Sequence, residues 1–293
     1  MGNSQYQIQW FPGHMAKTRR LIGENLKYTD IVIELRDARI PYSSKNPEIE
    51  KIIGDKPRLI LLNKATLADP EINRAWLRYF EERKEKCLLI DCVSGAGIKD
   101  IYPAVCEILS EKMARWSEKG MNKKVRAMVV GIPNVGKSSF INRIAGSKKA
   151  KVEDRPGVTL NKQWVSTSIG LELIDMPGVL WPKFDEKKVG ENLAMTGAIK
   201  DQILDTEELA MLLCGRLRDI APKAFAERYK LTDADGWMEL DLYDLFELVG
   251  KKRGFLMAGG VINTERTADT ILNEFRAAAI GCISLEAPKN KKV

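Results

Sequence analysis

The chain has 293 residues and a net charge of +7, and its apolar content of 44% suffices for one large domain or two ordinary ones. The five cysteines are scattered without a CxxC pair and there is a single histidine, which argues against a structural zinc site. Cysteines used in this way suit a reducing cytoplasm. The sequence contains no apolar run of about 18 residues, so no membrane span is expected. The positive charge favours an acidic partner, RNA first, with neither DNA nor a membrane expected, although mere solubility would also account for it.

The first part of the chain alternates strands and helices. A basic amphipathic helix is expected at 15–28, and Pro70 suits the first turn of a helix that runs toward Lys86. Short apolar runs predict buried strands at 31–35, 58–62 and 87–90. Polar residues follow the second and third of these strands: Asn63-Lys64-Ala65-Thr66 and Asp91-Cys92-Val93-Ser94.

The middle of the chain contains its most specific motif. After a long predicted helix at 98–117 and a polar connector at 118–124, an apolar strand at 125–130 leads into Gly131-Ile132-Pro133-Asn134-Val135-Gly136-Lys137-Ser138. This is the GxxxxGK[ST] phosphate loop in the strand–loop–helix setting that it requires. Backbone N–H groups and a helix N-terminus cradle phosphate there, Lys137 adds positive charge, and Ser138 offers a hydroxyl to Mg²⁺.

The segments after this loop supply candidate metal and switch residues. Thr159, in Pro156-Gly157-Val158-Thr159, is a candidate second hydroxyl for Mg²⁺. Runs at 162–167 and 171–174 predict a hairpin, and Asp175 ends its second strand as a carboxylate that reaches toward the metal would. Gly178, in Asp175-Met176-Pro177-Gly178, is placed to sense the terminal phosphate through its N–H group.

This order places the candidate base motifs before the phosphate loop, so the sequence predicts a circularly permuted nucleotide-binding domain at 1–200. Its alternating strands and helices predict an α/β fold with a mostly parallel sheet. Beyond residue 200 the pattern becomes helical, at 207–220, 222–229, 240–251 and 266–279, with Asp241 and Thr267 as expected helix starts and Gly250 and Gly254 as expected stops. Residues 201–293 are therefore expected to form an all-helical domain with a basic tail.

The permuted order and several motifs resemble the YlqF/RbgA family of ribosome-biogenesis GTPases. The motifs are Trp10-Phe11-Pro12-Gly13-His14-Met15, Asp37-Ala38-Arg39-Ile40-Pro41, the phosphate loop, Asp175-Met176-Pro177-Gly178 and Ile283-Ser284-Leu285-Glu286-Ala287-Pro288. The resemblance implies a cytoplasmic GTPase that helps to mature the large ribosomal subunit, binds its precursor and ribosomal RNA, and is stimulated by ribosomal particles.

Within that resemblance, His14, Lys137 and Gly178 are the expected catalytic residues. The residue after Gly178 is apolar and cannot orient the attacking water, and the resemblance assigns that role to His14. Mg²⁺ is expected on Ser138, Thr159 and Asp175, and K⁺ beside Asn134, where it would supply positive charge. The expected GTP-binding residues are Asn63, Lys64, Ala65, Thr66, Asp91, Cys92, Asn134, Val135, Gly136, Lys137, Ser138, Ser139, Thr159 and Gly178.

Both base motifs depart from the usual pattern. The aspartate that ends the usual NKxD is replaced by Thr66, and alignment on Gly95 and Gly97 places Asp91-Cys92-Val93 where Ser-Ala-Lys normally stands. The Cys92 N–H group can still donate to guanine O6, and Asp91 or Asp69 is a candidate substitute for the missing carboxylate. GTP preference is expected to survive, weakened by the roughly 1.5–3 kcal/mol of a charged hydrogen bond.

Basic residues offer candidate RNA contacts at both ends of the chain. The N-terminal set is Lys17, Arg19, Arg20, Arg36 and Arg39, the set around the switch is Lys148, Lys149, Lys151 and Arg155, and the helical set is Lys251, Lys252, Arg253 and Arg276. The alternatives are a solvated charged face, or an Arg39 that instead binds Asp37. Two other functions also stay open: an RNA-binding protein gated by nucleotide, and a translational or small-subunit GTPase factor.

Overall fold

The computed structural model describes residues 12–145, 164–178, 180–181, 184 and 186–288, with the side chains of 12–16 outside the description. Six strands form one sheet in the order β3-β2-β1-β4-β6-β5, and every neighbouring pair is parallel except β5 with β6. The strands are β1 (Ile31–Asp37), β2 (Arg58–Asn63), β3 (Cys87–Leu89), β4 (Val125–Gly131), β5 (Trp164–Ser166) and β6 (Leu171–Asp175).

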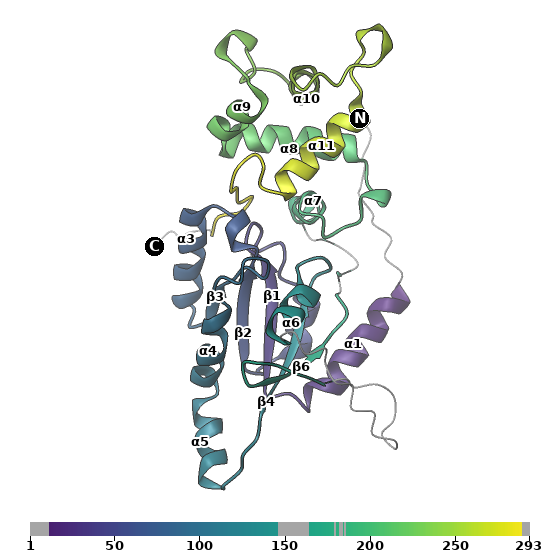
Figure 1. Cartoon of the computed structure of the whole chain (residues 1–293). Coiled ribbons are helices and arrows are strands. Elements are labelled where there is room, and N and C mark those ends of the chain that lie inside the picture. The colour runs from purple at the N-terminus through teal and green to yellow at the C-terminus, as the bar shows by residue number, and fades with distance from the viewer. Residues whose placement is uncertain (1–11, 146–163, 179, 182–183, 185, 289–293) are drawn as a thin grey trace.

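Helices surround this sheet and then form a separate group at the end of the chain (Figure 1). They are α1 (Pro12–Leu26), α2 (Pro47–Ile53), α3 (Pro70–Glu81), α4 (Ile101–Ile108), α5 (Ser110–Glu118), α6 (Lys137–Ala145), α7 (Lys187–Met195), α8 (Thr206–Ile220), α9 (Pro222–Tyr229), α10 (Leu242–Lys252) and α11 (Thr264–Arg276). Short 3₁₀ turns lie at η1 (Ala65–Leu67), η2 (Ile98–Asp100), η3 (Asp201–Ile203), η4 (Asp233–Asp235) and η5 (Ala258–Gly260).

The alternation of side chains along the strands creates three layers. Val32, Met128 and Val130 pack with residues of α1 and α2 on one face, and Ile60 and Leu62 pack with α3 on the same side. The intervening residues of the same strands pack with α4 and α6 on the other face. Because both faces are covered, the central strands are buried almost throughout; β4 is apolar except for Arg126, whereas the second half of β1 carries the buried charges Glu34, Arg36 and Asp37. The predicted α/β fold with a mostly parallel sheet is confirmed.

The helices α8, α10 and α11 pack on one another above the carboxyl ends of the strands, as Figure 1 shows. Their apolar side chains belong to the same continuous core as one face of the sheet. The predicted helical character of the chain after residue 200 is confirmed. The boundary at residue 200 stays a prediction, although α7, which precedes it, packs against α8. Of the helices that the structure describes, none has the length and apolar character needed to cross a bilayer.

Helix ends follow local chemistry where a cap decides them. The Asp69 side chain accepts from two backbone N–H groups at the start of α3, and Asp241 caps α10 as expected. The expected start at Thr267 is wrong, because Asn263 caps α11 and the helix begins at Thr264, three residues earlier. The expected stop at Gly250 is also wrong. A Cβ there would lie 2.7 Å from the Thr267 hydroxyl, so this glycine permits close packing of α10 on α11, and the helix stops before Gly254 instead.

Two further expectations changed at helix ends. The predicted helix at 98–117 is divided into η2, α4 and α5, because Leu109 takes φ −100° and ψ 13° between the last two. The helix that starts at Pro70 ends at Glu81 rather than near Lys86. The helices α2 and α7 were not predicted, since short helices produce too few turns for a distinct apolar period.

Replacement of Phe140 by alanine should lower the free energy of unfolding by about 3–5 kcal/mol, because this ring is fully buried between α6 and the sheet. Asn142→Ala is the matched control, since Asn142 lies exposed on the same helix. Urea denaturation followed by circular dichroism measures both variants. Equal midpoints for the two variants would contradict this packing.

Candidate functional site

The carboxyl ends of β1, β2, β4 and β6 bring the separated motifs together. The decisive contacts join the loop after β2 to the loop after β4, which is 70 residues or more away along the chain. Asn63 Nδ2 donates to the Val135 carbonyl at 2.8 Å, and Lys64 Nζ donates to the Asn134 carbonyl at 3.0 Å. The predicted convergence of the candidate base motif with the phosphate loop is confirmed.

Glycine is required where these two loops meet. Gly136 has φ +103°, and a Cβ built on it would lie 2.3 Å from Asn63 Nδ2. Any larger residue would push the two loops apart as well as strain the backbone. The neighbouring Val135 is buried, so its side chain anchors the phosphate loop in the core while its carbonyl holds Asn63.

Lys137 begins α6 and points back across the phosphate loop. Its Nζ donates to the carbonyls of Ile132 at 2.8 Å and Gly131 at 3.2 Å. Burial lowers the pKa of Lys137 to about 8, although the carboxylate of Asp175 opposes that shift. The lysine therefore stays protonated at neutral pH, and it is held only by neutral carbonyls that an anionic phosphate could replace.

Gly178 lies against this lysine. A Cβ on Gly178 would be 2.6 Å from Lys137 Nζ and 2.9 Å from the Pro133 Cα atom. Only a glycine lets the backbone after β6 approach the phosphate loop so closely. The geometry thus places the Gly178 backbone beside the lysine that would bind phosphate, as the sequence predicts.

Oxygen donors suited to Mg²⁺ occupy neighbouring positions. Ser138 and Ser139 are exposed in the first turn of α6, and Asp175 is exposed at the end of β6, which pairs with β4. Within the described residues no three His, Cys, Asp or Glu side chains converge on one metal. That agrees with a Mg²⁺ held by one carboxylate, a hydroxyl and substrate phosphates. Thr159 and the side chain of His14 lie outside the described residues, so their predicted roles stay predictions.

Asn134 connects the phosphate loop to the helical part of the chain. It has φ +55°, and its Nδ2 donates to the Gly197 carbonyl at 2.8 Å. This bond fixes the nitrogen end of the carboxamide, and the predicted K⁺ role of Asn134 stays a prediction. A cavity of about 520 Å³ opens at this junction, between Lys64 and Asn134 on one side and residues 196–202 with Arg276 on the other.

The two departures from the usual base motifs lie in contact with each other. Thr66 Oγ donates to Asp91 Oδ2 at 2.5 Å. The Cys92 N–H group donates to Asn63 Oδ1 at 3.1 Å, so its predicted contact with guanine O6 stays a prediction. Ala65 donates its N–H to the Ile90 carbonyl, which fixes the start of η1 beside the end of β3. Residues 63–66 and 91–92 therefore lie against one another, with Asn63, Asp91 and Cys92 buried and Thr66 exposed.

A buried ion pair lies beside these residues, and the sequence only partly predicted it. The guanidinium of Arg39 donates to both oxygens of Asp37, at 2.9 and 2.8 Å, as the alternative for Arg39 expected. Lys64 Nζ lies 3.0 Å from the same carboxylate. Burial alone would raise the pKa of Asp37, but Arg39 and Lys64 together lower it well below its ordinary value. Asp37 therefore orients the lysine of the base motif.

The C-terminal segment returns to the same loop, which sequence reasoning missed. It runs beside α3 in Figure 1. Leu285 N donates to the Arg39 carbonyl, Ser284 Oγ accepts from Asp69 N, and Cys282 Sγ lies 3.1 Å from the Thr66 carbonyl. The Glu286 carboxylate accepts from the backbone N–H of Tyr42. Residues 282–286 thus brace the candidate base loop from the side opposite the phosphate loop.

Three arginines expected on an RNA-binding surface are engaged inside the protein instead. Arg36 and Arg39 are buried, at 3% and 1% exposure, and pair with Glu34 and Asp37. The guanidinium of Arg276 binds Asp201 and the carbonyls of residues 194 and 195. The sequence predicted RNA contacts for these arginines because a count of charges does not reveal burial. Only tertiary contacts distinguish them from exposed basic residues.

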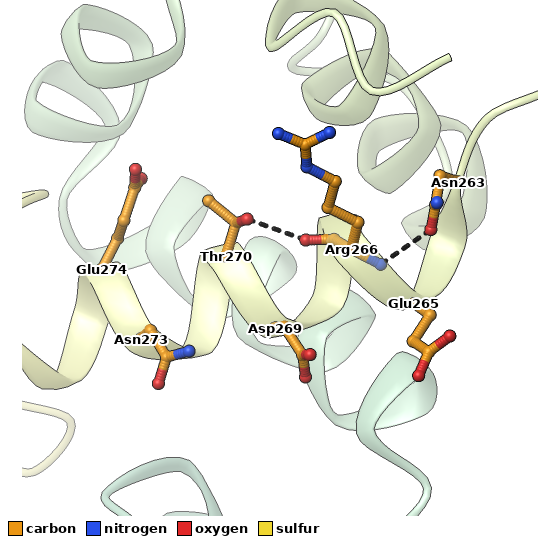
Figure 2. A pocket seen from close by; sticks show the side chains of 7 residues that line it. All are labelled: Asn263, Glu265, Arg266, Asp269, Thr270, Asn273 and Glu274. Carbon is orange, nitrogen blue, oxygen red and sulfur yellow. Dashed lines mark hydrogen bonds between the residues drawn. The ribbon is translucent and has the colours of Figure 1, made fainter. Parts of the chain in front are cut away.

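A second cavity lies along α11, far from the strand ends, and Figure 2 shows why it is no candidate site. Arg266, Thr270 and Glu274 point to one side of the helix, whereas Glu265, Asp269 and Asn273 point to the other. Side chains that diverge in this way cannot surround one ligand. The strand ends therefore remain the candidate site.

Comparison with known proteins agrees with this geometry. Residues 126–231 match the family model described as 50S ribosome-binding GTPase. The chain is 48% identical to Ribosome biogenesis GTPase A of Priestia megaterium over 96% of this chain and 97% of that protein. It is 32% identical to Mitochondrial ribosome-associated GTPase 1 of Mus musculus, over 95% and 90% of the two chains.

Solved structures share the fold. The GNP-bound YlqF from T. maritima superimposes with a TM-score of 0.64 at 24% identity, over 94% of this chain and all of that one. The GDP-bound structure of YlqF gives a TM-score of 0.65 at the same identity, over 92% and 99% of the two chains. The permuted arrangement of strands therefore occurs in experimentally determined structures.

Replacement of Arg39 by methionine should lower the free energy of unfolding by about 3–5 kcal/mol, because it removes the main partner of a buried carboxylate. Arg20→Met is the matched control, since Arg20 pairs with Glu24 on the exposed side of α1 and its loss should leave stability unchanged. Guanidinium denaturation of both variants measures the difference. Arg39→Met with the stability of the unsubstituted protein would contradict a structural role for the pair.

Proposed function

The chain belongs to the ribosome biogenesis GTPase A family, and we propose from this membership that it hydrolyses GTP as an assembly factor for the large ribosomal subunit. The observation that carries the proposal is the contact of Asn63 and Lys64 with the phosphate loop. That contact brings a base-binding motif and an anion-binding loop within the span of one nucleotide. The matched relatives are covered over nearly their full length, so the proposal concerns the whole chain.

The phosphate half of the site would work by charge neutralisation. Lys137 exchanges two carbonyl partners for phosphate oxygens, and the N–H groups of residues 134–139 surround the same anion. Ser138, Asp175 and Thr159 would hold Mg²⁺, which offsets negative charge on the phosphates when it is bound. The Gly178 N–H group, next to Lys137, would follow the presence of the terminal phosphate.

The attacking water needs a polar group, and the two residues that follow Gly178 in the sequence, Val179 and Leu180, are both apolar. Leu180 and Trp181 are buried in the apolar core, at 3% and 7% exposure. His14 is the single histidine of the chain and belongs to α1, and in this proposal its side chain orients the water. Docking on a ribosomal precursor would bring His14 to the phosphates and so stimulate turnover.

The remaining parts of the proposal concern location and partners. Binding would occur in the cytoplasm, to ribosomal RNA of the precursor, through basic residues that stay exposed. Arg20, Lys251 and Arg253 are supporting examples, because each is exposed in the structure. Contacts with RNA phosphates would make binding weaker as salt increases.

His14→Ala should keep its affinity for GTP while its particle-stimulated hydrolysis falls by about two to four orders of magnitude, as expected when a water-orienting group is removed. Multiple-turnover phosphate release, measured with and without immature large subunits, gives the result. Lys27→Ala is the control, since Lys27 is exposed just beyond the end of α1 and is not among the candidate RNA contacts. Unchanged stimulated turnover would remove His14 from the mechanism, and stimulation by small subunits alone would favour a small-subunit factor.

Potassium should support faster hydrolysis than sodium at equal ionic strength, because in this proposal the Asn134 carboxamide oxygen binds the larger cation beside the phosphates. Asn134→Ala should abolish that difference, since it removes the proposed ligand. Steady-state rates in the two salts, with choline as the inert reference, provide the measurement. Equal rates of the unsubstituted protein in potassium and sodium would refute the cation role.

A further inference from the structure

Thr66 and Asp91, which depart from the usual base motifs, have the hydroxyl and the carboxylate in exchanged positions. The first motif normally ends in an aspartate, and this chain has Thr66 there; the second normally begins with a serine, and this chain has Asp91. Each residue alone is a departure from its own motif. Together they retain one hydroxyl and one carboxylate, and the structure joins the two groups by a hydrogen bond of 2.5 Å between Thr66 Oγ and Asp91 Oδ2.

The hydrogen bonds of Asp91 leave one acceptor position open. Its Oδ1 accepts from the N–H groups of Val93 at 2.9 Å and Ser94 at 2.7 Å, which uses both lone pairs of that oxygen. Oδ2 accepts from the Thr66 hydroxyl, and a carboxylate oxygen has a second lone pair. Because Thr66 donates its single proton to Asp91, the lone pairs of its own oxygen remain as acceptors, and Thr66 is exposed. Two acceptor oxygens thus lie side by side, about as close as the two oxygens of one carboxylate.

Asp69 can be set aside as the alternative source of the carboxylate. Its side chain caps α3 by accepting from the N–H groups of Glu71 and Ile72. Its own N–H donates to Ser284, so the residue is held against the C-terminal segment. Asp91, by contrast, follows β3 and faces the hydroxyl of the base loop.

We propose that Thr66 Oγ and Asp91 Oδ2 together form the edge that recognises guanine, one accepting from the N1–H group and the other from the exocyclic amino group. The inference rests on the proposed GTP-binding function and names the groups that select the base. The negative charge of Asp91 strengthens both bonds, directly at Oδ2 and through its hydrogen bond with the Thr66 hydroxyl. The exchanged pair therefore restores the two-point, charge-assisted contact that the sequence of the first motif lacks.

The surroundings keep this edge charged and fixed. Burial would raise the pKa of Asp91, but the hydrogen bonds from Thr66, Ser94 and Val93 outweigh it and lower the pKa. Arg143 of α6 donates to the Cys92 carbonyl at 3.0 Å and also to the Val93 carbonyl, so the loop after β3 is attached to the helix that follows the phosphate loop. The base-recognition edge and the anion-binding loop are thus held in one frame.

The first test exchanges the acceptor for a donor. Asp91→Asn keeps an oxygen for the N–H groups of Val93 and Ser94 but presents an amide N–H₂ to the base. Its dissociation constant for GDP should rise about ten- to a hundredfold, and its affinity for xanthosine diphosphate, which has a carbonyl in place of the amino group, should rise at least tenfold. Asp69→Asn is the matched control and should leave both affinities unchanged, because asparagine caps a helix as well as aspartate does.

The second test restores the usual arrangement. Thr66→Asp alone places two carboxylates in contact and should weaken GDP binding, and Asp91→Ser alone removes the charge and should weaken it too. The double variant Thr66→Asp/Asp91→Ser should bind GDP within about threefold of the unsubstituted protein, because the same groups are present in exchanged positions. Such rescue cannot arise from a general loss of folding.

Competition of GDP, ADP and xanthosine diphosphate against a fluorescent guanine nucleotide measures every variant, with thermal melts to monitor folding. Asp91→Asn with unchanged preference for GDP over xanthosine diphosphate would overturn the inference, as would a double variant no better than Asp91→Ser. If the unsubstituted protein itself bound no guanine nucleotide, the proposed function would fail instead, so the two failures are distinguishable.

Discussion

The candidate site depends on the attachment of the loop after β2 to the loop after β4. Asn63 and Lys64 donate to carbonyls of the phosphate loop, and Gly136 permits that approach because it has no Cβ. In a permuted chain the base motif is made first and the phosphate loop later, so no local turn connects them. Parallel pairing of β1 with both β2 and β4 brings their carboxyl ends to one edge, and the two hydrogen bonds then fix their distance.

A second set of contacts links this edge to the rest of the molecule. The buried Asp37 binds Lys64 on one side and Arg39 on the other, and Arg39 in turn donates to the Arg276 carbonyl at the end of α11. Residues 282–286 brace the loop after β2 from the opposite side. A displacement of the helical group would therefore act on the base loop. It would also act on the phosphate loop through the hydrogen bond between Asn134 and Gly197. This arrangement is suited to coupling of nucleotide binding to the docking of a large partner.

Several features were accessible from the sequence because their determinants are local. The phosphate loop, the strand that leads into it, the helix start at Asp241 and the alternation of strands with helices all follow from spacing within about ten residues. Others were inaccessible because they depend on what lies beside a residue. The sequence does not reveal that Arg36 and Arg39 are buried rather than exposed. Nor does it reveal that Gly250 permits close packing of α10 on α11 rather than ending a helix.

Local patterns in the sequence were enough to predict a phosphate loop, a permuted order of motifs, a mostly parallel α/β sheet and a helical C-terminal third. How the unusual base motifs are completed depends on tertiary contacts, because Thr66 and Asp91 are 25 positions apart and follow different strands. A comparison of each base motif with its usual pattern, position by position, finds two unrelated substitutions, Thr66 and Asp91. The lateral pairing of β2 with β3 makes them one hydrogen-bonded pair, since strands that are neighbours in a sheet bring the residues after their ends into contact whatever their separation along the chain.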